Sequence, residues 1–208
     1  MPIVNRISEF QPDITAWRRE LHAHPELMYE VHRTADFVAA KLREFGCDEV
    51  ATGIGRTGVV GRIKGRKPAQ GDGIKAVALR ADMDALPIEE ETGAPYRSTV
   101  PGRMHACGHD GHTAMLLGAA RYLAETRNFA GDAVVVFQPA EEGGAGAAAM
   151  LDDGLVDKYG IEEIYGMHNA PGMAVGTFAL RAGPAMASTD HVDIEIEGIG
   201  GHAAAPHQ

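Results

Sequence analysis

The spacing of apolar and polar positions alternates between a helical and a strand period along the first part of the chain. Apolar residues recur three and four positions apart over residues 14–22 and again over 30–45, and Gly46 is a natural end for the second run. The apolar runs at 57–65 and 73–88 are typical of strands, and a loop rich in Gly, Lys and Pro separates them. This part of the chain therefore predicts two helices followed by two strands.

The alternation continues through the middle of the chain and then changes. Residues 111–126 predict the clearest helix, 131–154 predict a strand, a turn and a helix, and 161–171 predict a short strand. Strands that alternate with helices indicate an α/β fold with a mostly parallel sheet covered by helices. The segments 175–183 and 188–201 have the pattern of strands, with no helix between them.

Composition and charge exclude several classes of protein. The net charge of −10 argues against nucleic acid as the main partner, because phosphate binding needs a basic surface. No apolar run is long enough to cross a membrane, and the N-terminal residues do not resemble a signal peptide. Cys47 and Cys107 are too few for a disulfide framework, so we expect a cytoplasmic protein. Cys47 has apolar neighbours and is expected in the core.

Three of the predicted strands run into residues that commonly bind metals. Asp82 and Asp84 follow the first of these strands, Glu141 and Glu142 follow the second, and His168 follows the third. The carboxyl ends of parallel strands lie at one edge of a sheet, which is where α/β proteins bind ligands. We therefore expect these side chains to meet in one cleft.

The loop before the predicted helix 111–126 supplies further ligand types. Cys107 and His109 lie in this loop and can reach the same edge of the sheet. Together the candidates offer sulfur, nitrogen and oxygen atoms that suit a borderline divalent ion such as Zn, Mn, Co or Ni. Of two adjacent glutamates, one can bind a metal while the other takes a proton from a water that the metal polarises.

Each candidate also has a simpler interpretation. A single free cysteine is often a small buried apolar residue, and adjacent glutamates are often a solvated surface pair. His112 falls inside the helix, where it would pack or orient a neighbour, and Asp110 would support the loop. His105 is expected in the loop rather than as a ligand. The joint pattern, rather than any one residue, predicts a metal centre.

Six segments of the sequence resemble the two-metal amidohydrolases that include hippurate hydrolase, N-acyl-amino-acid amidohydrolases and hydrolases of auxin conjugates. These enzymes are a branch of the aminoacylase and carboxypeptidase metallopeptidases. The resemblance implies that residues 1–187 are part of a metal-dependent catalytic domain and that 188–208 begin an inserted α+β lid and dimerisation domain. The segments are RRELHAHPEL, LRADMDALPIEE, HACGHDGHTAMLLGAA, FQPAEEGGAGAAAML, GMHNAP and GIGGHAAAPH.

The resemblance also implies a role for each candidate residue and a site that holds two divalent ions. Glu141 matches the general base, and His202 matches a histidine that stabilises the oxyanion in the partner's active site across a dimer. Asp84 matches an acidic residue that orients the site from behind the ligands. Asp82 stands where other branches have a histidine ligand, so it and His112 are expected to support the ligands. The implied metal ligands are Cys107, which lies between the two ions, together with His109, Glu142 and His168.

The activity implied by the resemblance is hydrolysis of the amide bond of small N-acyl amino acids such as hippurate. Carboxypeptidase, dipeptidase and N-acetyl-amino-acid deacetylase activities remain alternatives, and a redox-sensing thiol at Cys107 is a far weaker one. Family members are longer, form homodimers or tetramers, and take a last histidine ligand from a region that would lie beyond Gln208. An inactive fragment with at most one structural metal is therefore the alternative outside the enzyme class.

Overall fold

The computed structural model describes residues 5–68, 75–184, 188, 190, 192–205 and 207. The chain divides into two units, residues 1–171 and residues 172–208. Among the described residues, every helix and strand belongs to the first unit. No helix in the described part of the chain has the length and apolar character needed to span a membrane.

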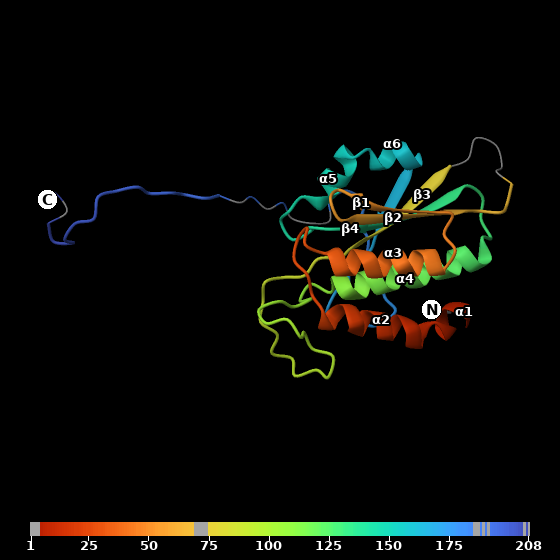
Figure 1. Ribbon diagram of the computed structural model, residues 1–208, viewed down its shortest axis with the longest axis horizontal. Helices are drawn as coiled ribbons and strands as arrows, with labels where there is room; N and C mark the ends of the chain where they lie inside the picture. The colour runs from red at the N-terminus through yellow and green to blue at the C-terminus, as the bar shows by residue number, and fades with distance from the viewer. Residues whose placement is uncertain are drawn as a thin grey trace. The chain divides into compact units, whose positions relative to one another are not determined.

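Four helices lie on one side of the sheet in two layers (Figure 1). The helices α3 (His32–Glu44) and α4 (His109–Thr126) pack on the strands, while α2 (Gln11–Ala23) packs on α4. A short helix, α1 (Asn5–Glu9), precedes α2. The three longer helices were predicted, with ends that differ by at most three residues, and Gly46 has the positive φ of 79° expected of a residue that ends a helix.

The sheet has five strands in the order β1-β2-β4-β3-β5. Neighbouring strands β3, β4 and β5 are parallel, whereas β2 pairs antiparallel with both β1 and β4. The predicted α/β fold with a helix-covered sheet is confirmed, but the sheet is mixed because β2 runs against the other four strands. The strands are β1 (Glu49–Ile54), β2 (Gly58–Lys64), β3 (Ala76–Asp82), β4 (Asp132–Gln138) and β5 (Glu163–Gly166).

Strand β4 shows why the sheet is buried on both faces. Val135 and Phe137 belong to the apolar core that α3 and α4 share with the sheet. Val134 and Val136 belong to a second core on the opposite face, which α5 (Gly146–Asp152) and α6 (Leu155–Tyr159) cover. A strand covered on both faces has a continuous apolar run, which is the pattern of this segment.

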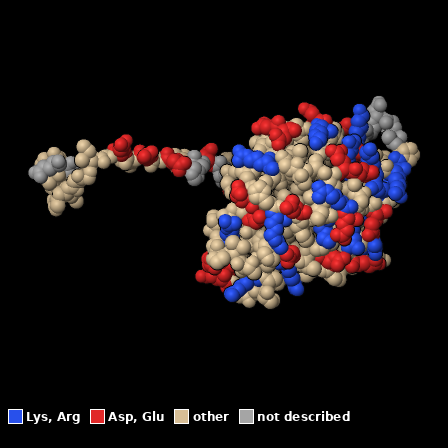
Figure 2. Space-filling model, in the orientation of Figure 1, with Lys and Arg blue, Asp and Glu red and all other residues tan. Residues whose placement is uncertain are grey.

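Figure 2 shows how charges are distributed over one face of the molecule. On the first unit, Lys and Arg groups are interspersed with Asp and Glu groups and do not gather into one basic surface on this face. On this face the mixed charges offer no continuous contact for a phosphate backbone.

The second unit corrects one prediction. The described residues of 175–183 and 188–201 form no strand, whereas the sequence pattern predicts two. Residues 189 and 191 lie outside the described part of the chain. A strand needs a neighbour for its backbone groups, and exposed Val192, Ile194 and Ile196 retain the alternating pattern without such pairing. The predicted domain boundary after residue 187 stays a prediction.

Three short elements were not predicted. Strand β1 carries Gly53 at a positive φ of 82°, and its register with β2 shifts between Thr52 and Ile54. A strand that is interrupted in this way gives no clear alternation in the sequence. Helices α1 and α6 have five residues each, which is too short to show a helical period.

Candidate metal centre

The register of the parallel strands places the candidate residues at one edge of the sheet. Asp82, the last residue of β3, lies opposite Gln138, the last residue of β4. Arg80 lies opposite Gly166, where β5 ends two residues before His168. Because these three strands are parallel, the segments that follow them leave the sheet on the same side, as predicted from the sequence.

Gly108 allows the loop before α4 to present Cys107 and His109. Its φ of 94° is a left-handed backbone conformation that residues other than glycine rarely adopt. A Cβ atom at this position would also lie 2.6 Å from the side-chain oxygen of Asn169. The chain therefore turns into α4 against Asn169, and only glycine fits at this point.

His168 faces Cys107 across the site. Its Nε2 atom lies 3.3 Å from Cys107 Sγ, and its Nδ1 atom lies 2.8 Å from the carbonyl oxygen of Asn169. A carbonyl oxygen can only accept, so Nδ1 carries the hydrogen and Nε2 keeps its lone pair. This tautomer directs a free nitrogen toward the thiol, which is the arrangement of a histidine that binds metal.

His109 is fully buried and surrounded by carboxylates. Its Nε2 atom lies 3.6 Å from Asp82, 3.8 Å from Glu141 and 3.7 Å from Glu142, and its Nδ1 atom lies 3.5 Å from Asp84. Burial acts to lower the pKa of His109, but Asp84, Asp82 and Glu142 outweigh it and raise that pKa. So many acidic groups around one ring favour a cation in this space.

Asp84 fixes the two glutamates through their backbone. One of its oxygens accepts from the amide of Glu141 at 3.0 Å, and the other accepts from the amide of Glu142 at 3.1 Å. Ala140 and Ala145, on either side of the glutamates, have positive φ values of 51° and 53°. Two non-glycine residues in this conformation store strain, and such strain is concentrated at functional sites.

The loop that carries the glutamates is also held from the segment between α2 and α3. The backbone amide of Ala140 donates to the carbonyl oxygen of Met28 over 3.1 Å. The Tyr29 hydroxyl donates to the carbonyl of Gly144 over 2.5 Å. These contacts leave the Glu141 and Glu142 side chains free to face the site.

Asp82 and His112 contact each other beside His109, and the ligand atoms of these three residues lie within 4.8 Å of one another, so the expectation that Asp82 and His112 only support the ligands stays a prediction. One oxygen of Asp82 lies 2.7 Å from His112 Nδ1, and the other accepts from Arg80 over 2.8 Å. On the other side of the ring, His112 Nε2 lies 3.0 Å from the backbone amide of Asn169 and 2.5 Å from its side-chain oxygen. Burial opposes ionisation of Asp82, yet His112, His109 and Arg80 lower its pKa to about 2.

These residues fit a divalent metal by their chemistry. Ligand atoms of Cys107, His109 and His168 all lie within 4.8 Å of one another, as do those of His109, Glu141 and Glu142. Both nitrogens of His109 and one oxygen of Glu142 are buried without a hydrogen-bond partner among the described residues. Sulfur, imidazole nitrogen and carboxylate oxygen in one cluster suit a borderline ion.

The Cys107 thiol and the Glu142 carboxyl both have raised pKa values, so each favours its neutral form more than usual. Burial and the neighbouring Glu142 raise the pKa of Cys107 to about 11. Burial also raises the pKa of Glu142, and Glu141 adds to the effect. A cation would reverse both shifts, because it stabilises the ionised ligands.

Four other predicted residues lie elsewhere. Cys47 packs against the apolar core as expected, and its thiol pKa is raised by burial to about 11. His105 is in the loop and buried, and burial lowers its pKa to about 4. Asp110 is buried in the first turn of α4. His202 belongs to the second unit, where its Nδ1 atom accepts from the amide of Ala204 over 3.2 Å.

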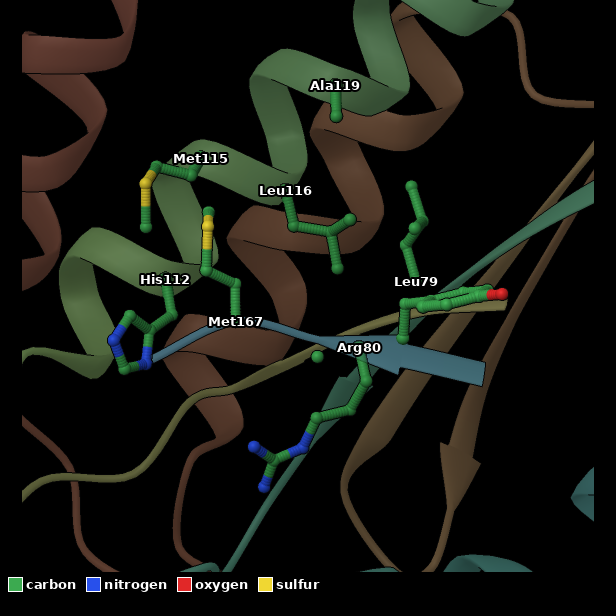
Figure 3. A pocket seen from close by; sticks show the side chains of 9 residues that line it. Leu79, Arg80, His112, Met115, Leu116, Ala119 and Met167 are labelled. Atoms are coloured by element: carbon green, nitrogen blue, oxygen red, sulfur yellow. The ribbon is translucent and has the colours of Figure 1, made fainter. Parts of the chain in front are cut away.

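An apolar cavity of about 270 Å³ lies next to the candidate centre but is distinct from it. Figure 3 shows Met115, Leu116 and Ala119 from α4 on one side of the cavity and Leu79 on the other. Of the candidate site residues, His112 alone lines it. The cavity therefore touches the candidate centre only through His112, and none of Cys107, His109, Glu142 and His168 lines it.

Asn169 and His22 are site residues to which the sequence analysis gave no role. Asn169 contacts Gly108, His112 and His168, and its position next to His168 in the segment GMHNAP was the available signal. His22 lies 2.8 Å from Asp110, a residue 88 positions later in the chain, and no local pattern indicates such a contact.

Comparison with known proteins gives a family and close relatives. The model of peptidase family M20/M25/M40 matches residues 78–207. The hippurate hydrolase of Campylobacter jejuni is 47% identical over 208 residues, which are 100% of this chain and 52% of the relative. The N-acetyl-L-cysteine deacetylase of Bacillus subtilis is 48% identical over 202 residues, which are 97% of this chain and 47% of the relative.

A solved structure agrees with these relatives. The YXEP protein of Bacillus subtilis, a dinuclear metal-binding peptidase from the M20 family, superposes with a TM-score of 0.78 and 41% identity. The match covers 85% of this chain and 48% of that protein. The chain thus spans about half the length of the curated relatives it matches.

Proposed function

Because the chain belongs to peptidase family M20/M25/M40, we propose that it forms the metal-holding part of an enzyme that hydrolyses the amide bond of N-acyl amino acids. The observation that supports this most directly is the cluster of sulfur, nitrogen and oxygen ligands at the ends of β3, β4 and β5. The described chain brings these groups together from segments that are far apart in the sequence.

The proposed ligands are Cys107, His109, Glu142 and His168, and the proposed occupants are two divalent ions. Similarity to a dinuclear metal-binding protein supports the number, while Mn, Zn, Ni and Co all remain compatible with these donors. A divalent ion bound here supplies Lewis acidity to the amide carbonyl and increases the acidity of a water molecule.

Glu141 is the proposed proton acceptor. Both glutamates lie within 3.8 Å of His109 Nε2, but the side chain of Glu141 is 40% exposed, compared with 19% for Glu142, so Glu141 is the one better able to reach a water and a substrate. Asp84 holds the backbone of both residues, which fixes the points from which the two side chains extend toward His109. Glu141 would take a proton from the attacking water and pass it to the leaving amine.

Hippurate-like compounds are the proposed substrates, and N-acetyl amino acids are the second candidates. Two relatives of nearly equal identity, a hippurate hydrolase and an N-acetyl-L-cysteine deacetylase, support one class each. Both reactions hydrolyse an amide and differ in the acyl group, so the same ligands would serve either.

Three further features belong to the same proposal. His202 would stabilise the oxyanion in the active site of a partner subunit, which implies a homodimer or a larger assembly of the longer protein. Residues 188–208 would begin the lid and dimerisation domain. A cytoplasmic location is proposed because Cys47 and Cys107 are free thiols.

The test combines metal content with amide hydrolysis. The 208-residue chain, and a chain of the relatives' length that contains it, are loaded with Mn²⁺ or Zn²⁺ and assayed with hippurate, N-acetylcysteine and a dipeptide. We expect bound metal in both and release of free amino acid from hippurate by the longer chain. A longer chain that binds two ions per subunit and hydrolyses none of the three would contradict the proposal.

A further inference from the structure

The segment RRELHAHPEL has no part in the chemistry proposed above, yet two of its side chains contact the start of α4. Arg18 Nε lies 2.7 Å from an oxygen of Asp110, and His22 Nδ1 lies 2.8 Å from the same oxygen. A carboxylate can only accept, so His22 donates its hydrogen bond to Asp110, while Arg18 forms an ion pair with the same oxygen. The Asp110 side chain is fully buried. This shared oxygen joins α2 to the first turn of α4, and the two helices lie side by side (Figure 1).

Glu90 completes the cluster from the loop that follows β3. One of its oxygens lies 3.2 Å from His22 Nε2, and the other accepts from the amide of Ser98 over 2.6 Å. Both ring nitrogens of His22 face carboxylates, and its bond to Asp110 raises its pKa although burial opposes this. Of the four side chains in this cluster, all but Arg18 are nearly inaccessible to solvent.

The position of this cluster relates it to the proposed ligands. Asp110 directly follows His109 in the chain, so the anchor point is one residue from a buried ligand. Glu90 anchors the loop that leads from β3 toward Cys107. The cluster thus fixes the residue that follows His109 and a point in the long loop that leads from β3 to Cys107.

We propose that Arg18 and His22 are positioning residues of the metal centre, which act through Asp110 and Glu90 to hold Cys107 and His109 in the geometry that binds metal. This inference rests on the proposed function, because the segment they hold carries the proposed ligands. If Arg18 and His22 only packed α2 against α4, their replacement would lower the free energy of unfolding. It would not change metal affinity or the amide exchange of residues 105–110 in the folded protein.

The first experiment compares Arg18→Gln with Arg19→Gln in the full chain. The two arginines are matched, because their guanidinium groups lie 5.1 Å and 5.0 Å from the ring centre of Tyr96. Of the two, only Arg18 forms an ion pair within the described chain. Co²⁺ binding is measured by the absorption band that arises when the ion binds the Cys107 thiolate. Hydrogen exchange of the backbone amides of residues 105–110 is measured in the metal-free protein.

We expect Arg18→Gln to weaken Co²⁺ binding about tenfold, to alter the cobalt–thiolate absorption and to speed exchange in the ligand segment, as the loss of a group behind a metal ligand does. Arg19→Gln should change none of these. Equal Co²⁺ affinity and equal exchange in the two variants would overturn the proposal. If the parent chain does not bind Co²⁺, the proposed metal centre fails, and the exchange comparison by itself still decides the positioning role.

A second pair of variants tests the buried histidine. His22→Gln removes the imidazole ring between Asp110 and Glu90, while His24→Gln changes a half-buried histidine whose Nδ1 donates to the carbonyl of Glu20 over 2.9 Å. We expect His22→Gln to weaken Co²⁺ binding and to speed amide exchange in residues 105–110, and His24→Gln to change neither. Should His22→Gln fail to fold, which the loss of one partner from a buried ion pair can cause, the arginine comparison carries the test.

Discussion

Cys107 Sγ lies 3.3 Å from His168 Nε2, although 61 positions separate the two residues in the chain. One residue comes from the loop before α4 and the other from the segment after β5. The His168 tautomer leaves the nitrogen that faces the thiol without a hydrogen. A thiol and an imidazole nitrogen directed toward the same space, next to buried carboxylates, form a site that needs a cation.

Replacing Cys107 with Ala should lower both metal content and the pH dependence of metal binding. The thiol has its pKa raised to about 11, so it must lose a proton to bind at neutral pH. Rising pH therefore strengthens metal binding, by about tenfold per pH unit for this one proton. Titration of Zn²⁺ between pH 6 and 8 should show that Cys107→Ala weakens binding and lowers this slope by about one proton.

Cys47→Ala is the matched control for this variant. Its thiol also has a pKa raised to about 11, but it packs against the apolar core. The slope and the affinity should match those of the parent chain. If Cys47→Ala and Cys107→Ala behave alike, Cys107 is a packing residue and not a ligand.

Glu141→Gln should keep the metal and lose turnover in the longer protein. The amide side chain cannot accept the proton from the attacking water, and we expect kcat to fall by about 10²–10⁴-fold. Metal content by elemental mass spectrometry should stay at the parent value. Glu91→Gln, at an exposed position in the loop after β3, serves as the control and should leave kcat unchanged. Near-normal turnover in Glu141→Gln would show that another group is the base.

Asp84→Asn should weaken metal binding without unfolding the protein. The amide offers one acceptor where the carboxylate offers two, so the backbone N–H of either Glu141 or Glu142 loses its partner. We expect a loss of about 10–100-fold in metal affinity, measured by competition with a chelator. Asp36→Asn, on the exposed side of α3, should bind metal like the parent chain. An unchanged affinity in Asp84→Asn would mean that the glutamates are held by other contacts.

Leu117→Ala tests the core that positions α4 on the sheet. The side chain is fully buried in the cluster between α4 and β4, and its truncation should cost about 2–5 kcal/mol of unfolding free energy. Met115, two residues earlier on the same helix, is 40% exposed, so Met115→Ala should cost about 1 kcal/mol or less. Urea unfolding of the two variants measures the difference. Equal costs would contradict the packing described for α4.

The residues of the centre could be predicted because they follow periodic elements. The run before Asp82 and the run before Glu141 are continuous and apolar, as expected of strands buried on both faces. Their carboxyl ends must then share an edge, and His168 follows a third strand of the same direction. Local pattern and the geometry of parallel strands were sufficient to place these side chains together.

Other features depend on contacts that no local pattern encodes. The pairing of β2 with β4 sets its direction against the other strands, and this pairing joins residues that are far apart in the chain. The contact of His22 with Asp110 spans 88 positions and depends on how α2 packs on α4. The alternation after residue 175 predicts two strands, and this prediction is wrong for the described residues, because alternation forms a strand only where a neighbour exists.

Anomalous diffraction from crystals grown with Zn²⁺ decides whether Cys107, His109, Glu142 and His168 bind metal. We predict a strong peak about 2.3 Å from Cys107 Sγ and about 2.0–2.1 Å from the nearest histidine nitrogens. Zinc peaks found only at other positions, with Cys107 and His168 still in direct contact, would show that these four residues are not the ligands.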